Sequence, residues 1–118
     1  MDIGRVWFVP RRLNEIDMQK AAAVLIGKHD FTSFRAKHCQ ALSPEKTIRD
    51  ITVNRIDDEI QIFAEAKSFL HHQVRNIVGT LKLVGEGRWT EQDVIRILKA
   101  KDRSIAGPTA PAAGLYFA

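Results

Sequence analysis

The hydrophobic pattern of the chain changes its period after Ser68, and this change limits the fold more than any other feature of the sequence. Before it, apolar and polar residues alternate along residues 51–55 and 60–66, as they do in half-buried strands. The residues Asp57-Asp58-Glu59 join the two stretches, and acidic residues favour turns because their side chains bond to nearby backbone. The sequence therefore predicts an antiparallel β-hairpin with a solvated turn, in preference to an acid–base or cation site at the acidic trio.

After Ser68 the apolar residues follow a helical spacing. They share one face of a helix that begins near Leu70 and that Gly85 and Gly87 end. This is the clearest helix in the sequence. Its apolar stripe consists of Leu70, Val74, Ile77, Val78, Leu81 and Val84.

Two further helices are predicted from their first residues. An amphipathic helix begins at Thr90, where Asp93 three residues on completes a capping box. Another helix, nearer the N-terminus, follows the N-cap Asn14 with Asp17 at the third helical position. Gly27 is placed to end that helix.

The remaining segments complete an α+β pattern. Residues 5–9 are apolar and rich in β-formers, whereas residues 29–39 show no period and predict an irregular connection. A loop from Gly107 enters the short apolar segment 115–117. The order of elements predicts a single α+β domain over residues 1–118, with a largely antiparallel sheet and helices packed on a face. This length is sufficient for one hydrophobic core.

The composition says more about where the protein is located than about what it binds. No apolar run approaches the length of a membrane span, so we expect no membrane association. The start lacks the basic and apolar regions of a secretory signal, and the single cysteine cannot form an internal disulfide, so a cytoplasmic location is expected. The formal net charge of +4 permits a polyanionic partner without identifying one.

The predicted helix after Ser68 has an unusual second face. His71, Arg75, Gly79 and Lys82 follow one another at spacings of four, four and three, and therefore line one side. A glycine inside a helix costs about 1 kcal/mol relative to alanine. We therefore expect another backbone or a ligand to approach closely at Gly79. Arg75 is a candidate for a partly buried guanidinium that faces a carboxylate or phosphate, and the alternative is an exposed surface arginine.

Other reactive residues carry weaker patterns. His71 and His72 point about 100° apart on a helix, and neither has a metal-ligating residue four positions on, so we predict no metal site. Cys39 beside His38 is read as a structural thiol in preference to a nucleophile. Phe31 and Phe34 could stack on nucleic-acid bases, with core packing as the alternative. The candidate phosphate contacts, each with a solvated charge as the alternative, are Arg11, Arg12, Lys28, Arg35, Lys37, Lys82, Arg96, Lys99, Lys101 and Arg103.

Three segments resemble, in sequence, order and spacing, the C-terminal half of the tRNA pseudouridine synthase A family. They are residues 27–36, 69–79 and 106–116, and the similarity spans practically the whole chain. The resemblance implies the C-terminal half of the pseudouridine synthase fold. It also implies isomerisation of uridine to pseudouridine at positions 38, 39 and 40 of the tRNA anticodon stem-loop, by a homodimer and without metal or organic cofactor.

Two site positions follow from the resemblance. Arg75 corresponds to the arginine that pairs with the catalytic aspartate, where a guanidinium keeps the carboxylate ionised and oriented. Leu115 corresponds to an apolar residue that packs beside the target base and excludes water. Gln73 stands where the family commonly has methionine, on what is expected to be a helix flank.

The catalytic aspartate of the family lies in its N-terminal half, in an Arg-Thr-Asp-Ala-Gly-Val-His-like motif that this sequence does not contain. We therefore expect the chain alone to be inactive, to need that N-terminal half as its partner, and to bind tRNA weakly and in a salt-sensitive way. The alternative is a stand-alone, non-catalytic RNA-binding α+β module, and a third possibility is a structural interaction domain.

Overall fold

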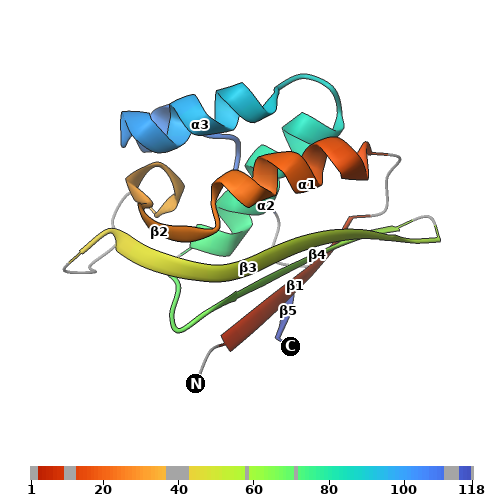
Figure 1. The fold of residues 1–118 in the computed structure, drawn as a ribbon, viewed down its shortest axis with the longest axis horizontal. Coiled ribbons are helices and arrows are strands. Elements are labelled where there is room, and N and C mark those ends of the chain that lie inside the picture. Colours follow the sequence, from red (N-terminus) through yellow and green to blue (C-terminus); the bar gives the residue numbers. More distant parts are fainter. Residues whose placement is uncertain are drawn as a thin grey trace.

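The computed structural model describes residues 3–9, 13–36, 43–57, 59–70, 72–110 and 115–117. Within these ranges the helices lie together on one side of the sheet (Figure 1), as the α+β prediction requires. Short 3₁₀ helices, labelled η, lie between some of the elements. In chain order the elements are β1 (Ile3–Val9), α1 (Glu15–Val24), β2 (Gly27–Asp30), η1 (Thr32–Phe34), β3 (Glu45–Ile56), β4 (Glu59–Ala66), α2 (Gln73–Gly85), α3 (Glu91–Ala100), η2 (Arg103–Ile105) and β5 (Leu115–Phe117).

The strands form one sheet in the order β2-β3-β4-β1-β5, and every neighbouring pair is antiparallel. The predicted hairpin is confirmed as β3 and β4, whose last and first residues, Ile56 and Glu59, are cross-strand partners. Asp57 at the turn has φ 54° and is exposed. Asp57 thus lies in the turn predicted from the sequence, Glu59 opens β4, and Asp58 lies outside the described residues.

The prediction of an irregular connection over residues 29–39 is wrong at its start. Gly27–Asp30 forms the edge strand β2, which pairs with residues 45–48 of β3. A strand of four residues takes its structure from this distant partner, so its own sequence carries no period. Gly27 has φ 101°, which turns the chain from α1 into β2, and the helix itself ends earlier, at Val24.

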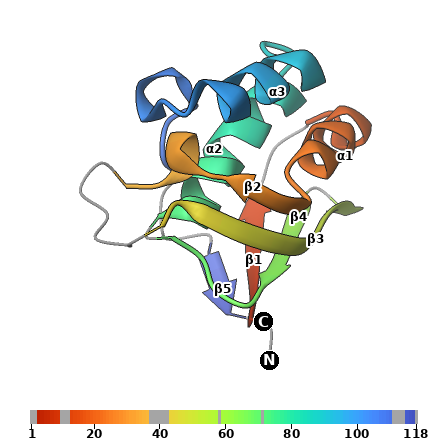
Figure 2. The ribbon, with the colours of Figure 1, turned by 60° about the vertical axis from the view of Figure 1, so that its left-hand side comes forward.

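The hydrophobic core lies between the helices and one face of the sheet (Figure 2). Along β4 every second residue is buried, from Ile60 to Ala66. The helical stripe predicted after Ser68 packs on this face, and Ile77 and Leu81 are 1% and 0% exposed. The sheet and the predicted face of α2 therefore build one core.

Both predicted helix caps are confirmed. The side chain of Asn14 accepts a hydrogen bond from the backbone N–H of Asp17 (3.0 Å), and Thr90 forms a reciprocal capping box with Asp93. The backbone hydrogen bond from Thr90 leads the contacts that lower the pKa of Asp93.

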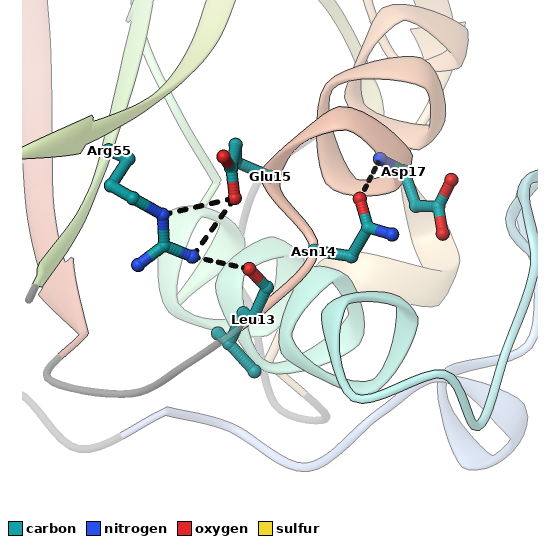
Figure 3. A network of polar contacts seen from close by, with 5 residues as sticks. All are labelled: Leu13, Asn14, Glu15, Asp17 and Arg55. Carbon is teal, nitrogen blue, oxygen red and sulfur yellow. Dashed lines mark hydrogen bonds and ion pairs between the residues drawn. The ribbon is translucent and has the colours of Figure 1, made fainter.

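Arg55 ties the end of β3 to the start of α1 (Figure 3). Its Nη2 donates to the carbonyl oxygen of Leu13 (2.6 Å) and to the carboxylate of Glu15 (2.9 Å). The side-chain hydrogen bond from Arg55 lowers the pKa of Glu15. The contact fixes where α1 begins relative to the sheet.

Candidate active site

Gly79 lies where the chain from Gly107 to Ala110 crosses α2. A Cβ atom at Gly79 would overlap the carbonyl oxygen of Pro108 and lie 2.8 Å from its carbonyl carbon. A Cβ atom at Gly107 would lie 2.9 Å from the backbone of Thr80. The expected close approach at Gly79 is therefore confirmed, and the approaching group is backbone.

Arg75 is bound to this crossing segment through both its main chain and its side chain. Its carbonyl oxygen accepts from the backbone N–H of Ala110 (3.1 Å), and its Nε donates to the carbonyl oxygen of Ala110 (2.8 Å). The side chain is partly buried. Within the described residues no carboxylate forms an ion pair with Arg75. Because Nε is bound to Ala110, the orientation of the guanidinium is fixed. Its two terminal nitrogens have the geometry to donate two parallel hydrogen bonds to a carboxylate.

A polar cluster that is buried at Asn76, Thr80 and Gly107 holds the crossing segment in place. Asn76, 1% exposed, accepts at Oδ1 from Arg103 Nη2 (3.0 Å) and from the hydroxyl of Thr109. Arg103 Nη1 donates to the carbonyl oxygen of Gly107 (3.0 Å), and the N–H of Gly107 donates to Thr80 Oγ1 (3.0 Å). We call Asn76, Thr80, Arg103, Gly107 and Thr109 the Arg103 clamp. It fixes residues 107–110, and through Ala110 it orients the Arg75 guanidinium.

The sequence places Arg103 among the candidate phosphate contacts, whereas the structure shows its guanidinium bonded within the chain. Its guanidinium points inward to Asn76 and Gly107, and burial lowers its pKa. The reading of Phe31 and Phe34 as base-stacking residues is also wrong, because both are 0% exposed and pack edge to face against each other. Their alternative, core packing, is confirmed.

Gln73 does not lie on a helix flank as expected. It is 0% exposed, and its Oε1 accepts from the backbone N–H of Leu70 (2.7 Å) at the start of α2. Within the described part of the chain, its Nε2 has no hydrogen-bond partner. The buried side chain of Gln73 therefore ties Leu70 to the first turn of α2.

The other candidates differ in how far their side chains are exposed and in whether the structure describes them. Lys28 is exposed, and its Nζ lies 3.8 Å from Glu45 Oε2. Arg35 and Lys82 are partly buried, and Leu115 lies in β5 opposite Trp7. The side chains of Arg96, Lys99 and Lys101 are exposed. The candidates outside the described residues are Arg11, Arg12, Lys37, His38, Cys39 and His71.

Across the residues that the structure describes, no three His, Cys, Asp or Glu side chains are grouped so as to hold a metal ion. None of the described helices is both long enough and apolar enough to cross a membrane.

Comparison with known proteins adds the family. The family model described as tRNA pseudouridine synthase matches residues 21–118. The chain belongs to this family. It is 62% identical over 117 residues to tRNA pseudouridine synthase A of Rhodospirillum centenum, covering 99% of this chain and 48% of the relative. It is 60% identical over 117 residues to the protein of the same name in Rhodospirillum rubrum, covering 99% of this chain and 42% of that relative. It is 56% identical over 115 residues to the one in Paramagnetospirillum magneticum, covering 98% of this chain and 45% of that relative. The chain spans about half the length of these curated relatives.

The resemblance predicted from the motifs is thus confirmed, and two of the three motifs meet in space. Residues 69–79 supply Arg75 and Gly79, and residues 106–116 supply the segment that crosses them. Sequence reasoning missed Asn76 and Thr80. The available signal was that both are polar residues next to predicted site positions, on a helix whose predicted stripe is apolar.

The clamp makes a prediction about stability. Arg103→Met keeps most of the side-chain volume but removes the donors to Asn76 and Gly107, so we expect a loss of about 2 kcal/mol in the free energy of unfolding. Urea denaturation measures it. Arg96→Met is the matched control, because Arg96 is exposed. Its ion pair with Asp93 (3.5 Å) contributes only about 0.3 kcal/mol to the free energy of unfolding. Equal losses in the two variants would contradict the clamp.

Proposed function

We propose that this chain is the C-terminal domain, over residues 1–118, of an isomerase that converts uridine to pseudouridine at positions 38, 39 and 40 of the tRNA anticodon stem-loop. The rest of the enzyme supplies the catalytic aspartate. The whole enzyme is proposed to act in the cytoplasm as a homodimer without metal or cofactor. Family membership supports the reaction class, and the names of the relatives support tRNA as the substrate.

The observation that carries the proposal is the arrangement of Arg75. Its guanidinium is fixed through Nε to Ala110, and it is not paired with a carboxylate of the described residues. A carboxylate from elsewhere in the enzyme, placed opposite the terminal nitrogens of Arg75, would have a lowered pKa, because the positive charge favours its ionised form. An ionised, oriented aspartate is the form that attacks as a nucleophile.

The segment that crosses α2 also connects the arginine to the proposed base pocket. It leads from Ala110, which binds Arg75, towards β5, where Leu115 pairs with Trp7 of β1. We propose that Leu115 packs against the target base and excludes water from it. Arg75 and Leu115 are the two site residues that we propose for this chain.

The proposal is tested by a chimera. The matching segment of the Rhodospirillum centenum relative is replaced by this chain, which is 62% identical to it, and tritium release from tRNA labelled at uracil C5 is measured. We expect the chimera to release tritium and the 118-residue chain alone to release none, because the proposed nucleophile lies outside it.

Two results would count against this proposal. Turnover by the chain alone would show that the nucleophile is within it. An inactive but folded chimera, together with tight tRNA binding by the chain alone, would favour the stand-alone RNA-binding module instead.

A further inference from the structure

A groove of about 490 Å³ lies away from the Arg103 clamp, at the end of the sheet where β3 begins and β4 finishes. Three separate segments meet there, because Lys28 of β2 pairs with Thr47, and Ala66, the last residue of β4, pairs with Ile48. The residues that line the groove include no apolar side chain. Its cationic side chains are Lys28, Lys46, Arg49 and Lys67.

The charge of this groove is only partly compensated. Glu45 is the one carboxylate among the lining residues that the structure describes, and its contact to Lys28 is long (3.8 Å), with both side chains more than half exposed. Lys46 donates to the neutral hydroxyl of Ser68 (3.0 Å). Neither Lys46 nor Lys67 forms an ion pair with a carboxylate of the described residues. The groove is therefore a local positive site.

A β-bulge shapes one wall of the groove. Ile48 pairs with Ala66 and Asp50 pairs with Glu65, so Arg49 is the extra residue on β3. The bulge lets both Ile48 and Ile51, three residues apart, face the core at 0% exposure, while Arg49 stays exposed on the groove side, 3.4 Å from Glu65. Bulges occur where a strand re-aims a side chain, often beside active sites.

The groove is connected to the candidate active site by a short piece of chain. From Lys67 and Ser68 the chain runs through Leu70 into α2, which begins at Gln73 and carries Arg75. Gln73 accepts from the backbone N–H of Leu70, which holds this connection against the helix. The groove and Arg75 are thus joined by a few residues of chain that follow Ser68.

We propose that this groove binds the phosphate backbone of the RNA substrate, beside the nucleotide that enters the active site. The inference rests on the proposed function and names the surface that holds its substrate. Lysine, arginine and hydroxyl side chains are the groups that contact RNA phosphates, and here Thr47 and Ser68 accompany the cations. A protein partner is disfavoured, because lysine is depleted in the cores of protein–protein interfaces, and three lysines line this groove.

The test removes two cations of the groove from the 118-residue chain. In Lys46→Gln/Lys67→Gln, affinity for a tRNA transcript should fall roughly threefold to tenfold at low salt, and the slope of log K against log salt should decrease by about 1.5. Filter binding at three salt concentrations gives both quantities. Lys46→Arg/Lys67→Arg keeps the charge and should keep the affinity.

Lys20→Gln/Arg88→Gln is the matched control. It removes the same charge from exposed positions on α1 and after α2, and it should change the affinity by less than about twofold. Thermal unfolding establishes that all variants are folded. Equal effects in the groove variant and the control, or none in either, would overturn the proposal, since a general charge effect or an unrelated surface would then explain the binding.

The same variants in the chimera separate this inference from the proposed function. The groove variant should raise KM for tRNA severalfold and leave kcat unchanged, because it removes binding and not chemistry. An inactive chimera whose tRNA affinity still depends on Lys46 and Lys67 would contradict the proposed function and support the groove. An active chimera in which the groove variant leaves KM unchanged would support the proposed function and contradict the groove.

Discussion

Gly79→Ala is expected to lower the free energy of unfolding by about 3 kcal/mol, because the added methyl group has no space. The carbonyl group of Pro108 occupies the position of the new Cβ atom, and this neighbour is backbone that cannot rotate away. Relief requires the segment to move off α2, which breaks its hydrogen bonds with Arg75 and Thr80. For a chain of this size the melting temperature should fall by roughly 10–15 °C.

Gly85→Ala is the control in the same helix. The nearest atom to its Cβ is the sulfur of Met18 (2.6 Å), at the flexible end of a side chain, although Leu13 Cβ lies at 2.9 Å. We expect this variant to lose about 1 kcal/mol, because Met18 can adjust. Melting curves of both variants decide the matter. A Gly79→Ala protein as stable as the parent would mean that residues 107–110 do not cross α2.

Local signals explain why much of the fold was predictable. The cap at Asn14 and the capping box at Thr90 depend on residues three positions apart, so the sequence displays them directly. The β3–β4 hairpin and the stripe of α2 follow from the spacing of apolar residues. The glycine at position 79 indicated a close approach because its cost in a helix needed a reason.

What the sequence did not reveal depends on partners far along the chain. Strand β2 exists because of β3, and Arg103 turns inward because Asn76, 27 residues earlier, accepts its hydrogen bond. The cationic groove was missed for the same reason. Lys46 and Lys67 are unremarkable in sequence, and only the pairing of β3 with β4 brings them together.

Arg75→Gln in the chimera is expected to lower kcat by about 10²-fold or more, with tRNA affinity little changed. Glutamine removes the charge that would hold the catalytic carboxylate ionised and the fork that would orient it. Arg75→Lys should remain strongly impaired, because a single ammonium cannot both donate to Ala110 and bind a carboxylate in two places. Single-turnover tritium release measures the rate, and filter binding measures the affinity.

The pH profile distinguishes this electrostatic role from a structural one. Loss of the guanidinium raises the pKa of the facing carboxylate, so the acidic limb of the rate profile should move to higher pH in Arg75→Gln. Lost stability alone would lower the rate without moving that limb, and Arg103→Met, which loosens the same segment but keeps Arg75, reports that effect. Arg96→Gln removes an exposed arginine and should leave rate and profile unchanged. An Arg75→Gln chimera with the parent's profile would mean that Arg75 faces no catalytic carboxylate.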